Sequence, residues 1–260
     1  MIKEAIRYIA GMLGYEIKKK PEHPFDLENE ADEAIRKVRH YTMLPRERLL
    51  YLYNQVVFCE KNNIPGSFVE CGVWKGGAVA LMALANMRFG GEPRHIHLFD
   101  SFQEICEPDA FVDGARAIRE VKKWTNDGGT DGKLIQVKGI YDALGGPGTL
   151  EGNRELLEKS IGYPPEFLHY HKGWFQDTLS TDADLIGSIA ILRLDSDWYA
   201  STKVCLEYLY DLVVLGGFVI VDDYGAYDGC RRAIDEFIGS RGISAYLSHA
   251  DAECRYWIKP

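Results

Sequence analysis

Long apolar runs and basic charge are both scarce in this sequence of 260 residues. No apolar run approaches the ~20 residues that a membrane-spanning helix needs, so we expect no integral membrane segment. Acidic residues outnumber basic ones, 39 to 30, and the net charge is −9. This charge argues against a nucleic-acid surface, because phosphate binding requires a basic patch. The N-terminus has no credible signal-peptide cleavage site, and we expect a cytoplasmic protein.

Paired cysteines are missing as well. The six cysteines are scattered, with none in Cys-x-x-Cys spacing, which is typical of reduced, buried thiols. No Ser/His/Asp or Cys/His arrangement is placed to form a covalent nucleophile. Two expected strands carry alternating histidines, which we interpret as core or edge residues rather than metal ligands: His95, His97, His169 and His171.

Glycines gather at one strand-to-helix turn. Residues 67–71 form an apolar strand, Gly72 and Gly76 follow, and an apolar helix is expected over 78–88. Glycines at such a turn let the backbone fold tightly and let a ligand approach the amides at the helix N-terminus. Glu70, at the tip of the strand, favours a ligand with ammonium and hydroxyl groups over a pyrophosphate. A tight turn without a ligand is the alternative for this stretch alone.

Strands and helices alternate along most of the chain. We expect helices at 30–38, 42–62, 78–88, 151–161, 201–214 and 229–239. We expect strands at 67–71, 94–101, 133–138, 167–171, 189–194 and 218–221, and a hairpin of 243–247 with 255–258. This alternation predicts an α/β fold with a doubly wound, mostly parallel sheet and right-handed crossovers. An antiparallel hairpin ends the chain on the sheet edge.

The chain divides into an N-terminal helical extension (1–62) and the sheet domain (63–260). Apolar residues at helical spacing in 1–20 predict an amphipathic helix that packs on a partner subunit or on the domain, with membrane association as a less favoured alternative. We expect a homo-oligomer, a dimer or a tetramer. Residues 21–30 indicate a linker. Residues 102–165 contain glycine clusters and lack sustained periodicity, so we expect a lid or substrate-binding insertion there.

Acidic residues stand where the expected strands end, the edge at which doubly wound sheets bind ligands. They are Glu70, Asp100, Asp195, Asp197, Asp222 and Asp223. Asp100 holds the position that binds ribose hydroxyls in nucleoside-binding α/β folds. Asp195 and the pair Asp222–Asp223 end consecutive strands, and carboxylates from neighbouring strand tips suit Mg²⁺. Because like charges repel, we expect a cation or a cationic ligand at this edge; capping of loop amides by the Asp pair is the alternative.

Six stretches carry a resemblance to a known family. They are Thr42–Arg48, IPGSFVECGVWKGG (64–77), LFDSF (98–102), KGWFQDTL (172–179), LRLDSDWYAST (192–202) and GGFVIVDDYG (216–225). Together they resemble the macrocin-type (TylF-like) sugar O-methyltransferases over about residues 42–240. The resemblance implies a class I methyltransferase, Rossmann-like fold. It also implies an enzyme dependent on S-adenosylmethionine and Mg²⁺ that methylates a deoxysugar hydroxyl of an antibiotic, another secondary metabolite or a glycoconjugate.

The resemblance also implies site residues. Those expected to bind the cofactor are Thr42, Glu70, Cys71, Gly72, Gly76, Asp100, Ser101 and Trp174. Those expected to bind the metal are Asp195, Asp222 and Asp223, and the catalytic base is Asp195 or Asp197. Gln103–Cys106 replaces the usual Gly-Leu-Pro-like turn, and the insertion up to about Tyr163 is longer than typical. Both departures bear on which acceptor the enzyme methylates, and not on the cofactor or the metal.

The expected reaction is an in-line attack on the cofactor methyl group by a sugar hydroxyl that the metal orients and a carboxylate deprotonates. The expected partner is a small-molecule, sugar-bearing acceptor. Two alternatives stay open. One is a metal-dependent O-methyltransferase for a catechol or another vicinal diol, and the other is a non-catalytic nucleoside-binding protein of the same fold.

Overall fold

The computed structural model describes residues 26–125 and 129–260. The chain divides into two units, 1–30 and 31–260. The amphipathic helix predicted for residues 1–20 lies outside the described residues. The linker predicted over 21–30 is wrong from residue 26 onward, where helix α2 (Asp26–Val38) begins.

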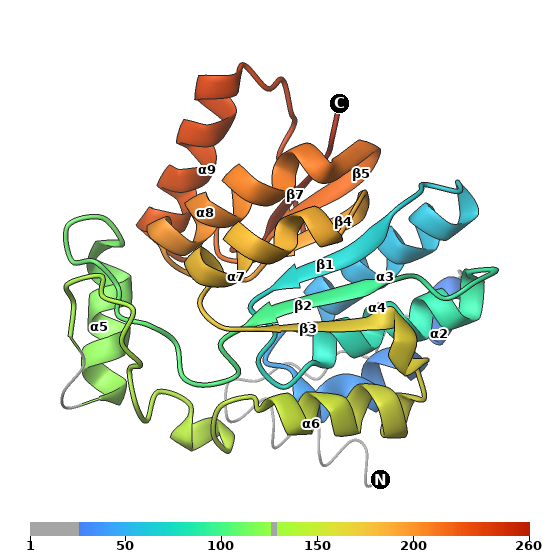
Figure 1. Ribbon diagram of the computed structural model, residues 1–260, viewed down its shortest axis with the longest axis horizontal. Coiled ribbons are helices and arrows are strands. Elements are labelled where there is room, and N and C mark those ends of the chain that lie inside the picture. The colour runs from blue at the N-terminus through green and yellow to red at the C-terminus, as the bar shows by residue number, and fades with distance from the viewer. Residues whose placement is uncertain (1–25, 126–128) are drawn as a thin grey trace, which may run out of the picture. The chain divides into compact units, whose positions relative to one another are not determined.

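A mixed sheet of seven strands lies at the centre of unit 31–260 (Figure 1). The strands are β1 (Ser67–Cys71), β2 (Ile96–Asp100), β3 (Leu168–Lys172), β4 (Ile189–Leu194), β5 (Val213–Val221), β6 (Ser248–His249) and β7 (Arg255–Ile258). Their order is β3-β2-β1-β4-β5-β7-β6. Strands β1 to β5 are parallel, and β7 runs antiparallel to β5 and β6. The doubly wound sheet with its C-terminal hairpin is therefore confirmed, and the strand order reverses direction between β1 and β4.

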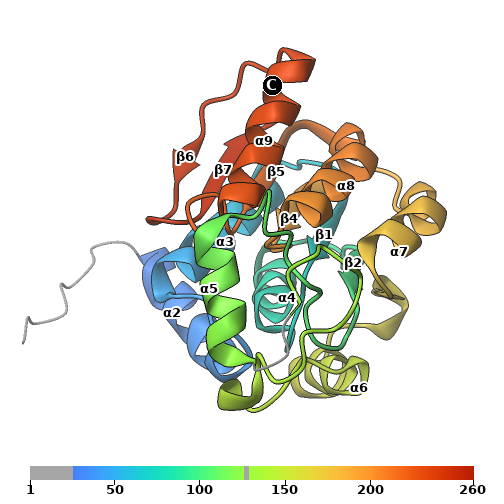
Figure 2. The ribbon, with the colours of Figure 1, turned by 90° about the vertical axis from the view of Figure 1, so that its left-hand side faces the viewer.

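Helices cover both faces of this sheet (Figures 1 and 2). They are α3 (Arg46–Lys61), α4 (Gly77–Phe89), α6 (Leu150–Arg154, continued as a π-helix over Glu155–Ile161), α7 (Phe175–Asp182), α8 (Tyr199–Leu209) and α9 (Asp228–Arg241). Helix α5 (Gly114–Trp124) lies instead beyond the carboxyl ends of the strands (Figure 1). Successive strand residues point to opposite faces. Phe68 of β1 therefore packs with the core of α3 and α4, whereas Val69 packs with that of α7, α8 and α9.

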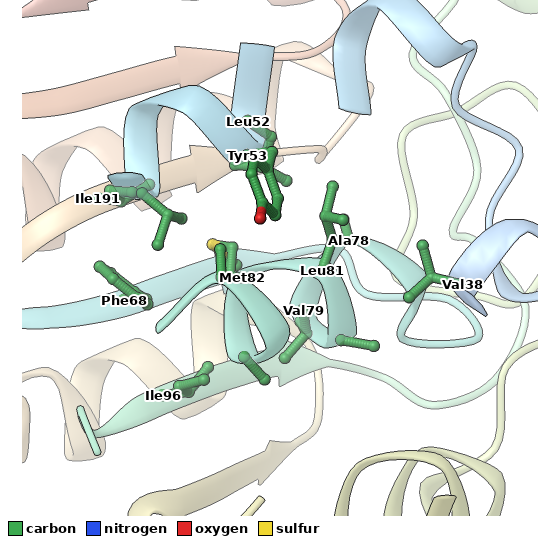
Figure 3. Packing of buried hydrophobic residues seen from close by; sticks show 14 of the residues in the cluster. Val38, Leu52, Tyr53, Phe68, Ala78, Val79, Leu81, Met82, Ile96 and Ile191 are labelled. Atoms are coloured by element: carbon green, nitrogen blue, oxygen red, sulfur yellow. The ribbon is translucent and has the colours of Figure 1, made fainter. Parts of the chain in front are cut away.

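Helix α4 is apolar on all sides because it is buried. Figure 3 shows Leu81 and Met82 of α4 between Tyr53 of α3 and the strand residues Phe68 and Ile191. All five side chains are at most 2 % exposed. Burial of each such side chain stabilises the fold by about 1.5–3 kcal/mol. This packing fixes the glycine turn between β1 and α4.

Three predicted elements differ from the structure. The strand expected over 133–138 is wrong, since only Gln136 there forms an isolated bridge, with Cys106. The helix expected over 201–214 ends at Leu209, and β5 begins at Val213. Gly216 and Gly217 therefore lie inside β5. Gly217 approaches β4 so closely that a Cβ there would be 3.0 Å from the Ala190 carbonyl oxygen. The hairpin forms, but its first strand is β6 rather than 243–247.

The segment 102–165 contains a helix, α5, that the sequence pattern did not predict. Only Ala117 and Val121 of α5 are buried, so its apolar periodicity is too short to recognise. They pack with Val137 and Trp198 in a small cluster of their own. The helix predicted at 151–161 is present as α6 and its π-helical continuation. Within the described residues, no helix combines the length and apolar character needed to cross a membrane.

Candidate active site

The carboxyl ends of β1, β2, β4 and β5 border two adjoining clefts. Predicted residues that line the first are Gly72, Asp100, Ser101, Trp174, Asp195 and Asp197. Predicted residues that line the second are Thr42, Glu70, Asp195, Asp197, Asp222 and Asp223. Because Asp195 and Asp197 border both clefts, a ligand in one can reach a ligand in the other at these two carboxylates.

Asp100 organises the glycine turn. Its Oδ2 accepts hydrogen bonds from the amides of Val73 (2.6 Å) and Trp74 (3.1 Å), and its Oδ1 accepts from the amide of Phe102 (2.6 Å). Burial raises the pKa of this carboxyl, although the three amide donors oppose the shift. A carboxylate has about four acceptor positions, so one remains for a ligand in the first cleft.

Gly72 has a structural role that its motif did not indicate. Its φ is +89°, and a Cβ there would lie 1.7 Å from the carbonyl oxygen of Asp195. The turn after β1 therefore contacts the turn after β4 directly, and the Asp195 amide donates to the Cys71 carbonyl over 2.8 Å. Cys71 and Gly76 line neither cleft. The Cys71 side chain is buried against α8, and Gly76, at φ +83°, caps α4.

The three predicted metal ligands lie together. Asp195, Asp222 and Asp223 each place a carboxylate oxygen within 4.8 Å of the others, the one such group of three that the described residues contain. Burial raises the pKa of Asp222 to about 6 and raises that of Asp223 well above its usual range. Asp223 Oδ2 is buried and has no hydrogen-bond partner. An unpaired buried carboxylate oxygen is costly, so this atom is available to a ligand.

A buried arginine lies among the acids of this edge; it belongs to the stretch LRLDSDWYAST, but the sequence analysis assigned it no role. Arg193, near the end of β4, is 1 % exposed. Its Nη1 donates to Glu70 and, over 2.9 Å, to Asp195, and its Nη2 donates to Asp222 over 2.6 Å. Its position inside a buried strand was the available signal, because arginine is rarely fully buried unless it is paired.

A second arginine reaches the same edge from α3. Arg48 Nη1 donates to Asp222 Oδ2 over 2.5 Å, so Asp222 accepts from both guanidinium groups. The expectation that only a bound cation explains the crowded acids is therefore incomplete, because Arg48 and Arg193 neutralise part of the charge. Within the described residues, neither guanidinium group bonds Asp197 or Asp223.

Asp197 occupies a strained turn. Its φ is +59°, and the amide of Trp198 donates to the carbonyl of Ser196 over 2.7 Å around it. Such a γ-turn is rare for a residue with a side chain and occurs mostly at functional sites. Burial and the nearby Asp195 raise the pKa of Asp197 well above its usual range. Within the described part of the chain, the Asp197 carboxylate accepts no hydrogen bond, so it is free to take a proton.

The four histidines lie on the α7 side of β2 and β3, away from the clefts. His97 stacks between His169 and His171, with ring centroids 4.5 and 5.4 Å away. His171 Nδ1 bonds Asp182 over 2.7 Å, and its Nε2 lies 3.1 Å from His97 Nδ1. This packing agrees with their interpretation as core and edge residues.

Comparison with known proteins identifies the family. The chain matches the family model described as Macrocin-O-methyltransferase (TylF) over residues 13–126 and 159–259. The gap between the two matched stretches falls within the expected insertion at 102–165. The matched stretches include all six of the resembling motifs.

Two curated enzymes are similar to most of the chain. One is the 8-demethyl-8-(2,3-dimethoxy-alpha-L-rhamnosyl)-tetracenomycin-C 4'-O-methyltransferase of Streptomyces olivaceus, and the other is the demethyldecarbamoylnovobiocin O-methyltransferase of Streptomyces niveus. Each is 33% identical over 217 residues, which cover 84% of this chain and 75% of that enzyme.

Solved structures agree with this assignment. The O-methyltransferase NovP superposes with a TM-score of 0.70 at 29% identity, covering 90% of this chain and 99% of that one. The calicheamicin methyltransferase CalS11 shares the fold, with a TM-score of 0.57 at 18% identity over 94% of this chain and 98% of that one. The chain therefore belongs to the macrocin O-methyltransferase family and is an S-adenosylmethionine-dependent O-methyltransferase.

Proposed function

We propose that this enzyme transfers a methyl group to a hydroxyl of a deoxysugar on a secondary metabolite, and that a divalent cation, Mg²⁺, binds at Asp195, Asp222 and Asp223. The observation that carries the proposal is the buried, unpartnered Oδ2 of Asp223 within this group of three carboxylates. Oxygen ligands of this kind suit a hard cation. When bound, the cation would supply Lewis-acid chemistry that favours ionisation of a sugar hydroxyl.

The sugar acceptor is supported by the relatives. The tetracenomycin enzyme is named for methylating a rhamnosyl compound, and the mycinamicin III 3''-O-methyltransferase of Micromonospora griseorubida is also similar, at 28% identity over 88% of this chain and 82% of that enzyme. Each of these relatives is named for a natural product. We therefore propose a glycosylated natural product as the acceptor class.

The two clefts suggest separate binding sites for the cofactor's adenosine part and for the acceptor. We assign the adenosine part of S-adenosylmethionine to the first cleft, where Asp100, Ser101 and Trp174 lie. We assign the acceptor to the second cleft, which contains the carboxylate group and the aromatic ring of Tyr227. Glu70 borders the second cleft with one buried carboxylate oxygen, Oε2, that has no partner, and this oxygen suits the cofactor's ammonium group.

Asp197 is better suited than Asp195 to remove the acceptor proton. Asp195 Oδ2 already accepts a hydrogen bond from Arg193 over 2.9 Å, so this oxygen is engaged before an acceptor binds. The Asp197 carboxylate has no such donor, and burial beside Asp195 raises its pKa, which makes it a stronger base. The strained turn at Asp197 fixes where this carboxylate can reach.

A labelled-cofactor assay tests the proposal. S-adenosylmethionine with a labelled methyl group is incubated with methyl L-rhamnoside, a rhamnosylated polyketide and catechol, and products are identified by mass spectrometry. We expect label on the rhamnosylated polyketide, dependence on Mg²⁺, and loss of turnover in Asp223→Asn. Label on catechol alone would move the enzyme to the catechol class, and full turnover without any divalent cation would remove the metal.

A further inference from the structure

Four charged side chains form a continuous line from α5 to Asp222. Arg116 of α5 donates to Glu253 Oε1 over 2.7 Å. Glu253 Oε2 accepts from Arg48 Nη2 over 2.6 Å. Arg48 Nη1 then donates to Asp222 Oδ2 over 2.5 Å. The line therefore joins the insertion to a carboxylate of the proposed metal site.

Solvent exposure falls along this line. The exposed fractions of the side chains are 43% for Arg116, 31% for Glu253, 9% for Arg48 and 5% for Asp222. An exposed ion pair contributes little by itself, but charges interact more strongly as they leave water. The outer pair, Arg116 with Glu253, can thus form and break easily, whereas the inner pair, Arg48 with Asp222, stays formed.

Arg48 is fixed on three sides, so it cannot absorb a movement of Glu253. Its Nε donates to Asp251 Oδ2 over 2.5 Å, in addition to the bonds to Glu253 and Asp222. Asp251 Oδ1 in turn accepts the amides of Glu253 and Cys254, which fixes the turn between β6 and β7. A guanidinium group is planar and rigid, so a displacement at one nitrogen is passed to the others.

Apart from the Arg116 pair, helix α5 is held by a small apolar cluster and by polar contacts, among them that of its N-cap residue Asp113, which accepts the amide of Tyr199 over 2.7 Å. Its two buried residues, Ala117 and Val121, belong to the small cluster around Trp198. Glu120 accepts a hydrogen bond from the hydroxyl of Tyr227 over 2.6 Å. Figure 2 shows that α5 begins close to the start of α9, where a Cβ at Gly114 would lie 2.2 Å from Asp228 Oδ2. Few apolar contacts and exposed polar tethers are typical of segments that open locally.

We propose that Arg48 and Glu253 are positioning residues that transmit the docking of α5 to Asp222, so that the cation site reaches its full affinity only while α5 is docked. This inference rests on the proposed function, because the role of Asp222 as a metal ligand is part of it. Docking of α5 beside Tyr227 would then occur together with the arrangement of Asp195, Asp222 and Asp223 that binds the cation.

The first test compares two exposed arginines. Arg116→Gln breaks the outer pair, and Arg241→Gln is the matched control, since Arg241 pairs with Asp211 at similar exposure, far from the clefts. The full chain is titrated with Mn²⁺ in a calorimeter. We expect the dissociation constant for Mn²⁺ to be at least about five times as large in Arg116→Gln as in Arg241→Gln. Affinity for S-adenosylhomocysteine should be equal in both. Equal Mn²⁺ affinities would overturn the coupling.

The second test needs no metal. Coupling is reciprocal, so weakening the inner end should loosen the outer end. Hydrogen exchange at α5 (Gly114–Trp124) should be faster in Arg48→Lys than in the parent or in Arg241→Gln, although the bonding partners of Arg48 are Asp222, Asp251 and Glu253 rather than residues of α5. Glu253→Gln provides a second variant should Arg48→Lys fold poorly. Unchanged exchange in both variants would overturn the proposal. Faster exchange together with no Mn²⁺ binding by the parent would support the coupling and reject the metal assignment instead.

Discussion

Arg193 Nη2 donates to Asp222 Oδ1 over 2.6 Å, between two side chains that are 2% and 5% exposed. This bond links the tips of β4 and β5 inside the protein. The same guanidinium also bonds Glu70 of β1, so one cation joins three neighbouring strands. The acidic edge is therefore an internally braced structure as well as a ligand site.

Removing this cation should destabilise the fold. In Arg193→Met, buried carboxylates that now face Arg193 would lose their partner, and breaking a buried ion pair from one side costs about 3–5 kcal/mol. Urea denaturation at pH 7.5 should report a loss of this order in the free energy of unfolding. Arg241→Met, at an exposed ion pair, should lose less than about 1 kcal/mol. A loss in Arg193→Met as small as in this control would show that the acids need no such brace.

Asp100 should be required for cofactor binding. Asp100→Ala removes the acceptor for the amides of Val73 and Trp74 and the carboxylate assigned to the ribose hydroxyls. We expect S-adenosylhomocysteine to bind at least about tenfold more weakly by calorimetry, since hydrogen bonds to charged groups contribute about 1.5–3 kcal/mol. Asp177→Ala, on the exposed side of α7, is the control. Parent-like affinity in Asp100→Ala would remove Asp100 from the ribose role.

Gly72 should tolerate no side chain. Gly72→Ala adds a Cβ at a left-handed φ of +89° and in contact with the Asp195 carbonyl oxygen. The left-handed conformation alone costs about 1–2 kcal/mol for an L-residue, and the clash adds to it and displaces the tip of β4. Thermal denaturation should show a clear drop, whereas Gly91→Ala, with open space around its Cβ position, should leave the melting temperature nearly unchanged. Equal melting temperatures for the two variants would contradict the close approach of the two turns.

Stability should fall in mild acid because of His97. Burial, together with His169, His171 and His95, lowers its folded pKa from 6.5 to about 3. Below pH 6.5 His97 is therefore protonated in the unfolded chain but stays neutral in the folded chain. Its contribution to the free energy of unfolding is lost as the pH falls from 6.5 towards 3. The loss between pH 6.5 and 5.0 is about 1.6 kcal/mol. Denaturation at the two pH values should show a smaller difference in His97→Gln than in the exposed control His249→Gln, and equal differences would assign the acid sensitivity to other groups.

The sequence predicts the sheet and its acidic edge well, because both follow from local pattern. Each acid comes directly after a short apolar strand, and parallel strands end at the same edge. Asp195, Asp222 and Asp223 can therefore be grouped from their positions along the chain alone. The grouping is a matter of topology, and their role as metal ligands stays a proposal.

The arginines could not be found in the same way. Arg48 lies in the first turn of α3, and its contact with Asp222 spans 174 positions in the sequence. A local sequence pattern cannot predict a contact between residues so far apart in the sequence. Helix α5 was missed because only two of its residues are buried, and propensity is a weak guide when packing contributes so little. These omissions matter, because the arginines change why the acids are tolerated.

The measurement that tests the account most directly is the methyl-transfer rate of chelator-treated enzyme, before and after Mg²⁺ is restored, with the rhamnosylated polyketide as acceptor. A neutral sugar hydroxyl is a poor nucleophile, so loss of a cation at Asp195, Asp222 and Asp223 should lower the rate by about 10²–10⁴, while S-adenosylhomocysteine still binds. Mg²⁺ should restore the parent rate but restore Asp222→Asn only in part. Methyl transfer at full rate by the chelator-treated enzyme would contradict the metal assignment, and the three carboxylates would then need another role.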